Sequence, residues 1–399
     1  MANTFTSVVK QHWANAIQDN LEKTLIAMEL AKMEDIPNGT TKNLPMVSFQ
    51  PTTDYTKYTD VTFKDITTAN DQLVINTTPM IPFNIDALDV EDNYISITPE
   101  VIRNATYKIK ERIEGDFLAE ILNAKWKYDN SGFGVNAGTL TPVALTTGAS
   151  QNISTVFGNA KAGLTNTGAN ANNIVLVVDS FTLVSLATLG LQTYGDVASE
   201  SYARGFRGTF GWMQVYEASA LTSTTTLDLA TNPTANDYIY IQGVKFTFVS
   251  SVGTTAGNVL IGVSADATAQ NLVSAVNGSA GAGTTYVELS ADDRASLSGV
   301  TATDGTDLVT FVSKRGALLA SSSMTNASND FQAQALNCAI MERGTIRMAL
   351  RDSVKIKEVE QTANLVTNYM VYARYGLKTP TRWASRMVRV VIQSVSAES

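Results

Sequence analysis

The sequence predicts an α+β fold, and three observations support this prediction. Residues from Thr98 to Ala124 carry apolar side chains at helical spacing over a long stretch, which is typical of an amphipathic helix. The segments Tyr55 to Ile66 and Gln72 to Asn76 alternate with a period of two, as half-buried strands do. Ile174 to Val178 is a continuous apolar run, which is typical of a strand covered on both faces.

Composition sets limits on size and chemistry. The chain has 399 residues, of which 44% are hydrophobic, so it is long enough for two or three domains or for one domain with an insertion. Its net charge of -8 argues against a generally basic nucleic-acid-binding surface and leaves only local basic patches. The one cysteine, Cys338, excludes an internal disulfide, and the one histidine, His12, excludes a His/Cys metal site. We therefore expect no metal and no cofactor.

Motifs for targeting and catalysis are not found in the sequence. Residues 1–10 lack the basic-then-apolar pattern of a signal peptide, so synthesis in the cytoplasm is expected. The most hydrophobic run, Ile174 to Leu191, is interrupted by polar residues, which favours a strand and a helix over a membrane span. The glycines of Gly205 to Ser219 are spaced G-x-x-G-x-x-G, which fits a turn and close packing and not a dinucleotide fingerprint. The chain is not expected to be an enzyme.

The N-terminal residues 5–33 form an amphipathic helical region, in which Trp13 and Leu21 share one apolar stripe. The stripe either packs within its own subunit or forms an arm that reaches a neighbouring subunit, and the spacing leaves both interpretations open. Pro37, Asn38 and Gly39 end the region, because this combination is typical of a turn.

The next residues are expected to form a long two-stranded excursion, because short Thr- and Tyr-rich segments alternate with polar turns. Strands are predicted at Met46 to Gln50, Tyr55 to Ile66 and Gln72 to Asn76. So few large apolar residues cannot hold the excursion in shape, so it should rest on another surface, such as that of a second copy of the chain. Candidate interface residues in the arm and the excursion are Trp13, Leu21, Tyr55, Lys57, Tyr58, Phe63 and Lys64.

An extended segment, Phe83 to Val90, is predicted to lead into the long helix. Four acidic residues in and after it lack the order and the glycine of an EF-hand loop, so no metal site is expected there. They are Asp86, Asp89, Glu91 and Asp92.

The long helix is predicted to begin at Thr98 as N-cap, with Pro99 in the first helical position and Glu100 opposing the helix dipole. At about 1.5 Å per residue it would span roughly 40 Å, which makes it a spine for the surrounding domain. The residues expected on its buried stripe are Ile102, Ile109, Ile113, Phe117 and Ile121.

An α/β pattern follows the spine helix. Residues 130–150 are rich in Gly, Thr and Asn and are expected to form a loop. A short helix at Ile153 to Leu164, the buried strand at Ile174 to Val178 and a helix from Ser180 to Leu189 come next. Gly205 to Ser219 then forms a turn and a further strand.

The composition shifts between Thr222 and Ala335 to Thr, Ser, Ala and Gly, with only 13 charged residues, which indicates an inserted domain. Tyr238 to Ser250 predicts a hairpin around Gln242-Gly243, and Asp266 to Asn277 a helix. Strands are expected at Thr285 to Leu289 and Leu308 to Val312. The charged groups Asp292-Asp293-Arg294 and Lys314-Arg315 are expected to be ordinary surface charges.

The interrupted α/β pattern resumes with a predicted helix from Phe331 to Glu342. Strands are then expected at Gly344 to Leu350, Val354 to Val359, Val366 to Gly376 and Arg386 to Ile392. Four arginines make this region locally basic. Three roles remain open for them: pairing within the sheet, contact with acidic groups of a neighbouring copy, or contact with nucleic acid. The arginines are Arg374, Arg382, Arg386 and Arg389.

Taken together, this order of elements resembles the major capsid proteins of tailed bacteriophages, which share the Hong Kong 97-like fold. The resemblance implies an N-terminal arm (1–40), an extended loop (41–80) and a peripheral domain with the spine helix (81–150). An axial domain (151–221) would be interrupted by a small, β-rich α+β inserted domain (222–335), and residues 336–399 would complete the axial domain and supply peripheral strands.

Function and partners follow from this resemblance. It implies a non-enzymatic coat protein that assembles through hexamers and pentamers into an icosahedral virion shell in the host cytoplasm. Scaffolding and portal proteins, a decoration protein and non-specifically bound internal double-stranded DNA are the implied partners, and no membrane is involved. Some relatives join a loop lysine to a neighbour's asparagine; Lys57 or Lys64 lies in the corresponding loop, but nothing in the sequence identifies the catalytic carboxylate, so cross-linking is not expected.

Two alternatives remain open at this level. An encapsulin-like compartment would have the same fold and enclose a protein cargo in place of a genome. A tail-tube or surface structural protein is suggested by the Thr- and Ser-rich β content, particularly that of residues 222–335.

Overall fold

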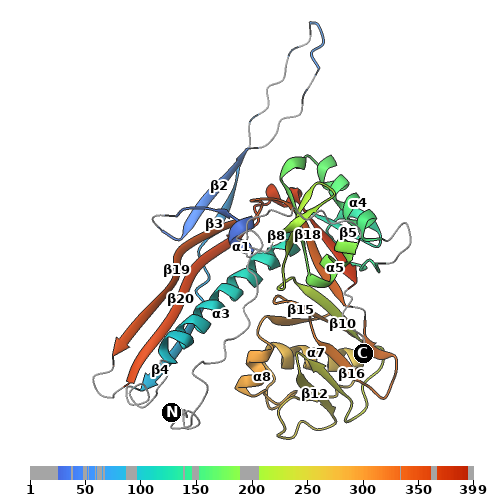
Figure 1. Ribbon diagram of the computed structural model, residues 1–399. Coiled ribbons are helices and arrows are strands. Elements are labelled where there is room, and N and C mark those ends of the chain that lie inside the picture. The colour runs from blue at the N-terminus through green and yellow to red at the C-terminus, as the bar shows by residue number, and fades with distance from the viewer. Residues whose placement is uncertain are drawn as a thin grey trace. The chain divides into compact units, whose positions relative to one another are not determined.

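The structure is a computed structural model that describes residues 26–36, 39–47, 68–86, 97–137, 140–145, 152–188, 206–332, 334–360 and 366–393, with residues 52, 54–58, 60 and 65 between. It confirms an α+β fold (Figure 1). The chain divides into two compact units. The described part of the first unit lies within Ala27–Ile113 and Arg343–Ser385, and that of the second mainly within Glu114–Glu342 and Arg386–Ser399.

The first unit is built on a four-stranded sheet in the order β1-β19-β20-β4. β19 (Arg347–Glu360) and β20 (Val366–Lys378) form a long antiparallel pair, which β4 (Met80–Asp86) joins antiparallel and β1 (Lys32–Met33) joins parallel. The strands predicted on either side of residue 352 are one strand, β19, because the ladder continues through a register shift at Asp352.

The spine helix α3 (Ile97–Ala119) continues into a 3-10 turn, η1 (Glu120–Asn123), which confirms the predicted helix. It begins one residue before the expected N-cap, Thr98, so that cap assignment is wrong. In the first unit, Ala105, Ile109 and Ile113 pack with Val371 and Ala373 of β20. Of the remaining predicted stripe residues, Phe117 and Ile121 are fully buried within the second unit, and Ile102 is half-buried.

The predicted excursion begins as a two-stranded ribbon, β2 (Thr41–Val47) with β3 (Thr68–Val74). Both strands lie earlier in the chain than predicted, and residues 54–58 form no strand, so the strand predicted at Tyr55 to Ile66 is wrong in its described part. Thr and Tyr favour strands wherever a partner strand is in register, and composition alone does not place that partner. Of the helical region predicted at residues 5–33, residues 26–33 are described: α1 (Ala27–Leu30) is helical, whereas Lys32–Met33 form strand β1, so the prediction is wrong there. His12, Trp13 and Leu21 lie outside the described residues.

The second unit contains an eleven-stranded sheet. Its centre is β18 (Ala335–Glu342), which pairs with β21 (Met387–Gln393) on one side and β7 (Ile174–Val178) on the other. The predicted strand at β7 is confirmed and is buried along its whole length. Outer strands of this part are β5 (Trp126–Asp129), β6 (Gly132–Val135), β8 (Phe206–Phe210) and β9 (Met213–Glu217).

Three helical segments belong to this part of the chain. The predicted helices are confirmed as α4 (Ile153–Asn166), whose N-cap Asn152 accepts a hydrogen bond from Thr155, and α5 (Ser180–Thr188). A short 3-10 turn, η2 (Ala171–Asn173), precedes β7.

Three sequence predictions in the second unit are wrong. The helix predicted at Phe331 to Glu342 consists of β17 (Asn329–Phe331) and β18, and since β18 is buried on both faces, its apolar pattern does not distinguish a strand from a helix. The loop predicted at residues 130–150 contains β6, which pairs with β5 as a hairpin. The strand predicted at Thr285 to Leu289 is reduced to isolated bridges of Tyr286.

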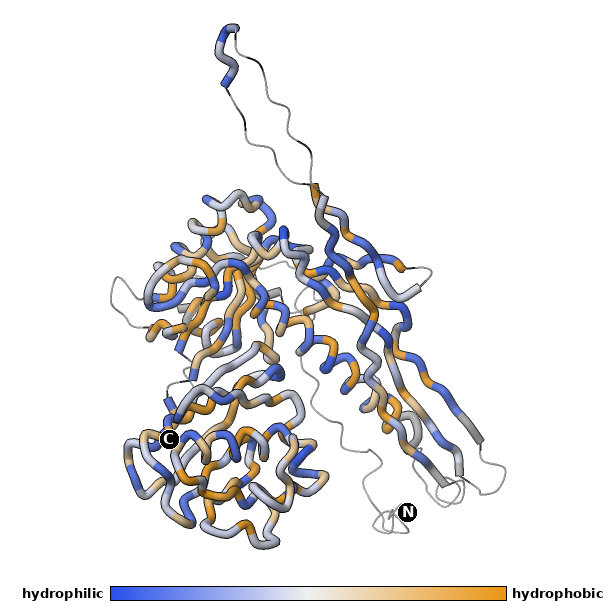
Figure 2. The backbone as a smooth tube through the Cα atoms, turned by 180° about the vertical axis from the view of Figure 1, so that it is seen from behind, coloured by the Kyte–Doolittle hydropathy of each residue, from blue (hydrophilic) through white to orange (hydrophobic). Residues whose placement is uncertain are grey.

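Residues 222–335 contain their own hydrophobic cluster, drawn from positions 227 to 318. One side of the cluster is the sheet β13-β12-β11-β16, and the helix α7 (Ala265–Asn277) packs into it. In Figure 2 the hydrophobic residues, in orange, are concentrated inside this part. Strands β10 (Ser223–Leu229), β14 (Val300–Asp304) and β15 (Leu308–Ser313) instead extend the large sheet, because β10 pairs with β18. The remaining elements are β11 (Tyr238–Ile241), β12 (Val244–Val249), β13 (Asn258–Leu260), α8 (Ala291–Ser296) and β16 (Ala320–Ser323).

Two local predictions in this region have different outcomes. The hairpin at Gln242-Gly243 is confirmed, and both residues have positive φ (52° and 79°), as a type I′ turn requires. Arg294 is not an ordinary surface charge: its guanidinium donates to the carbonyl oxygens of Val276 (2.7 Å) and Ala275 (3.2 Å), so it caps the C-terminus of α7.

Candidate subunit interface

The tip of the excursion presents two tyrosines to solvent. Tyr55 is 70% exposed and Tyr58 is 88% exposed, and Tyr58 has a φ of +69°, which bulky residues rarely adopt. The ammonium group of Lys57 lies 4.9 Å from the centroid of the Tyr58 ring. In Figure 2 the described residues at the tip are blue to pale, so their sequence is largely hydrophilic. Phe63 and Lys64, also predicted as interface residues, lie outside the described residues.

The base of the β2–β3 ribbon is fixed to the first unit. Leu73 is fully buried and packs with Ile36, Ile75 and Ala349. A Cβ atom added to Gly376 of β20 would lie 2.1 Å from the Val74 carbonyl oxygen, so the backbones approach as closely as glycine allows. The ribbon therefore extends from a base that is packed rigidly on β19 and β20.

The chain that leaves the predicted arm is fixed to the same sheet. Backbone hydrogen bonds join Lys32 to Ile346 (3.0 Å), Glu34 to Met348 (2.8 Å) and Gly344 to Leu30 (2.9 Å). Glu29 also pairs with Arg343 at 3.1 Å. Both segments that the sequence assigns to contacts with other copies thus originate on one sheet.

A cluster of charged side chains joins these two anchored segments. Glu34 binds Arg347 of β19 at 2.5 Å and Lys42 of β2 at 2.7 Å. Burial by itself raises the pKa of the Glu34 carboxyl, but the hydrogen bond from Lys42 and the charges of Arg347 and Lys42 outweigh it, so the pKa lies below its ordinary value. The guanidinium of Arg347 in turn lies 3.9 Å from the centroid of Trp383 in η3 (Trp383–Arg386).

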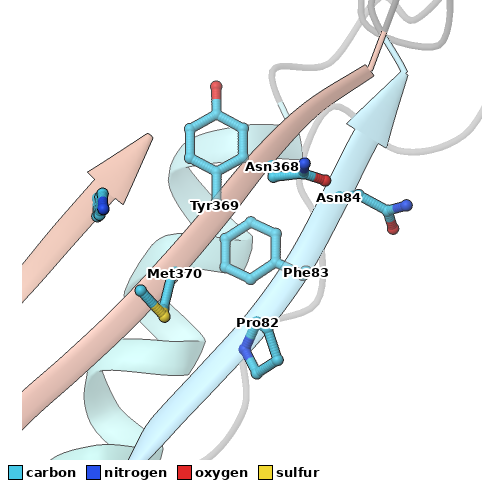
Figure 3. Close-up of a pocket in the computed structure, with 7 residues that line it drawn as sticks. Pro82, Phe83, Asn84, Asn368, Tyr369 and Met370 are labelled. Carbon is cyan, nitrogen blue, oxygen red and sulfur yellow. The ribbon is translucent and has the colours of Figure 1, made fainter. Parts of the chain in front are cut away.

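The face of this sheet that points away from α3 carries apolar side chains. Residues alternate along β4, where Ile81 and Phe83 pack toward the α3 cluster while Met80 on the other face is 55% exposed. A pocket of about 470 Å³ opens where β4, β20 and β19 meet (Figure 3). Pro82, Asn84, Lys357, Asn368 and Met370 line it together with Phe83 and Tyr369, whose rings lie on the α3 side of the sheet and stack with centroids 5.4 Å apart.

The four C-terminal arginines have different surroundings. Arg374 pairs with Asp352 at 3.9 Å, and Arg386 pairs with Glu342 at 3.2 Å. Arg389 donates to the Asn337 side-chain oxygen at 2.7 Å, and burial lowers its pKa to about 10. Arg382 is exposed and immediately precedes η3 in the chain. Pairing within the chain, one of the expected roles, is thus present for Arg374, Arg386 and Arg389.

The described residues offer no metal cluster and no membrane-spanning helix. Over the described residues, no cluster of three or more His, Cys, Asp or Glu side chains could hold a metal ion. Of the acidic group near the end of β4, Asp86 is described in its backbone, and Asp89, Glu91 and Asp92 lie outside the described residues. In the described helices, no segment is both long and apolar enough to cross a membrane.

The sequence identified Tyr55 and Tyr58 as candidate interface residues. It did not show how the strands pair in the sheet that supports the loop. Glu34 and Arg347 are 313 residues apart, and no local pattern connects them. Phe83 and Tyr369 likewise meet only because β4 and β20 pair. The one local signal was the alternation of Met80 to Asn84, which indicates a strand but not its uncovered face.

The chain is similar in structure, but not in sequence, to known proteins. No protein-family model and no curated protein sequence matches the chain. Among solved structures, the capsid structure of cyanophage P-SCSP1u matches with a TM-score of 0.50 and 10% identity, covering 99% of this chain and 96% of that chain. The mature capsid of bacteriophage PhiM1 matches with a TM-score of 0.51 and 8% identity, covering 97% of this chain and 92% of that chain. These likenesses confirm the predicted phage-capsid fold over nearly the whole chain.

Proposed function

We propose that this chain is the major capsid protein of a tailed double-stranded DNA bacteriophage, and that many copies assemble into the icosahedral shell that encloses the genome. The observation that carries the proposal is the loop of the first unit, whose exposed tyrosines stand on a ribbon with a rigid base. The fold shared with chains of two phage capsids supports it. The protein acts in the virion as a structural component and not as an enzyme.

Contacts between copies cover apolar side chains that are exposed in a single copy. The loop of one copy lies on a neighbour, where Tyr55 and Tyr58 lose their contact with water. The open face of the β4–β20 sheet, with Met80 and the neighbouring Pro82 and Met370, offers the apolar surface for this loop. Tyrosine suits such contacts because its ring is apolar and its hydroxyl keeps a polar partner.

Repetition of modest contacts then closes the shell. A contact between two different patches of identical chains forms rings when its rotation closes, which yields hexamers and pentamers. Many such interfaces act together, so no single one has to be strong. A scaffolding protein, a portal and a decoration protein are the expected additional partners, and assembly takes place in the host cytoplasm.

Packaged DNA meets the inner surface without sequence recognition. At a net charge of -8, the chain has no overall attraction for phosphate, so local Lys and Arg side chains make the contacts. Such contacts fix position without reading bases. Residues 222–335 act as an inserted domain that faces outward or braces neighbours.

Electron microscopy of the purified chain, alone and with its scaffold, tests the proposal. The wild-type chain forms closed isometric particles, and Y55S/Y58S lowers their yield at least about tenfold while the circular dichroism of the unassembled chain stays unchanged. Y240S is the matched control, since Tyr240 is an exposed tyrosine of β11, outside the loop. Compact monomers under every assembly condition would refute the proposal, tubes would indicate a tail protein, and particles filled with protein cargo would indicate a compartment.

A further inference from the structure

A further exposed aromatic residue, Trp212, lies at the tip of the β8–β9 hairpin. Phe210 and Met213 form the last pair of this hairpin, so Gly211 and Trp212 make a two-residue turn. Their φ values are +52° and +66°, as a type I′ turn requires. Glycine adopts this conformation freely, whereas tryptophan does so at a cost, because its Cβ crowds the backbone.

The indole of Trp212 is 92% exposed, although its neighbour Met213 is buried. The hairpin therefore packs its inner side into the second unit and points its largest apolar side chain into water. Exposure and left-handed backbone both disfavour tryptophan at this position in an isolated chain, where asparagine or glycine would suit the turn. Costly features of this kind are retained where a binding partner makes use of them.

The tip is held in place from below. The ammonium group of Lys161 in α4 donates to the Gly211 carbonyl oxygen at 2.6 Å. Burial lowers the pKa of Lys161, which indicates that its stem packs into the protein on the way to the turn. α4 itself is anchored by Phe157, Ala160 and Leu164, all fully buried. Trp212 is thus presented on a fixed support, which lowers the entropy lost on binding.

We infer that Trp212 is an anchor residue that inserts into an apolar site on a second copy of this chain. The inference rests on the proposed function and adds a contact made by the second unit to those of the loop and the sheet. Copies that each carry a net charge of -8 repel one another, so their contacts depend on apolar groups. Tryptophan is among the residues that contribute most to binding at protein interfaces. The hairpin is also well placed for this, since β8 pairs only with β9 among the described strands and so forms an edge of the large sheet.

The test replaces Trp212 with asparagine, which tolerates the left-handed turn and removes the indole. W212N leaves the melting temperature of the unassembled chain equal to that of the wild type or higher, because backbone strain is relieved. It raises the protein concentration needed for particle formation by about tenfold or more. V263A is the control: Val263 is also fully exposed, at 101%, but it lies in a loop of residues 222–335, and its replacement leaves assembly unchanged.

Two further measurements do not depend on the folding of W212N. Tryptophan fluorescence is recorded before and after assembly for the wild type and for W212F, and their difference isolates Trp212 from the other three tryptophans. This difference shifts to shorter wavelength and becomes protected from acrylamide on assembly. K161M, which keeps the apolar stem and removes the hydrogen-bond donor to Gly211, weakens assembly relative to the wild type.

The outcomes separate this inference from the proposed function. If wild-type particles form and W212N forms them at the same concentration, or if Trp212 stays open to acrylamide within particles, Trp212 is not an anchor while the capsid function stands. If the wild type forms no particles under any condition, both are refuted.

Discussion

Arg347 and Glu34 form a close ion pair between β19 and the segment that leaves the N-terminal region, at 2.5 Å, with the Arg347 guanidinium also stacked on Trp383. Their side chains are 8% and 13% exposed, so solvent screens the pair less than it screens a surface pair. Lys42 binds the same carboxylate from β2. One carboxylate thus joins the N-terminal segment, the loop ribbon and the sheet.

Replacing Glu34 by Gln should destabilise the first unit. The variant leaves a buried guanidinium without its counter-charge, and we expect a loss of about 1–3 kcal/mol in the free energy of unfolding. E29Q is the control, because the Glu29–Arg343 pair is more exposed and should contribute less than about 1 kcal/mol. Urea unfolding at pH 7 measures both, and equal losses for the two variants would contradict the special role of Glu34.

The same cluster should make stability depend on acid pH. The pKa of Glu34 is lower in the folded chain than its ordinary value of 4.5, so the folded state holds fewer protons than the unfolded state between the two values. The stabilisation is therefore complete above about pH 4.5 and is lost as the pH falls through the lowered pKa. Melting temperatures from pH 7 to pH 3 should fall less steeply for E34Q than for the wild type. Parallel curves would show that Glu34 is not responsible.

The contact between ribbon and sheet should tolerate no side chain at Gly376. A methyl group there would meet the Val74 carbonyl oxygen at 2.1 Å, so β3 or β20 has to move, and we expect G376A to cost about 3 kcal/mol. Gly134 has nothing within 4 Å of an added Cβ, so G134A should stay within about 0.5 kcal/mol of the wild type. Thermal unfolding distinguishes the two, and a stable G376A would show that the ribbon is not fixed at this point.

The open sheet face should matter for assembly and not for folding. Met80 is 55% exposed, so M80S should leave the unfolding free energy within about 0.5 kcal/mol of the wild type. If a neighbour's loop covers this face, M80S should reduce particle yield in a sedimentation assay. L319S is the control, because Leu319 is 66% exposed in a different part of the chain. Equal yields for wild type, M80S and L319S would argue against this face as the seat of the loop.

The inserted domain stays a prediction that deletion can test. Residues 225–333 contain the whole hydrophobic cluster of this region, so replacing them by a short linker should leave the rest foldable. Thr222 is kept, because its carbonyl oxygen accepts two hydrogen bonds from Asn337 of β18, each 3.0 Å. A soluble product with cooperative unfolding is the expected result. An insoluble product would show that β10 and β15 are needed to complete the large sheet.

Local sequence signals were sufficient to predict a helix, strand or turn whose structure depends mainly on its own residues. The apolar stripe located α3, although not its first residue, and the apolar run located β7, because helix period and full burial are both visible in a short window. Gln242-Gly243 placed its hairpin for the same reason, since positive φ values are needed at the turn. Tyr55 and Tyr58 were predicted as interface residues because few large apolar residues surround them; both are exposed in the single chain, and the interface itself stays a prediction.

Pairing between distant segments could not be derived in this way. β18 was predicted as a helix because its burial on both faces depends on β7 and β21, which come from other parts of the chain. The loop strands were displaced because Thr-rich segments fit several registers equally well. The Glu34–Arg347 pair and the Phe83–Tyr369 pocket depend on chain crossings that no local pattern contains.

The most direct test is a cryo-electron microscopy map of particles assembled from the wild-type chain. We expect closed icosahedral shells in which residues 54–58 of each copy lie against a neighbouring copy and Tyr58 is covered. A map, or a solution structure of the unassembled chain at high concentration, in which Tyr58 packs only against its own molecule and no lateral partner is present would contradict the proposed function.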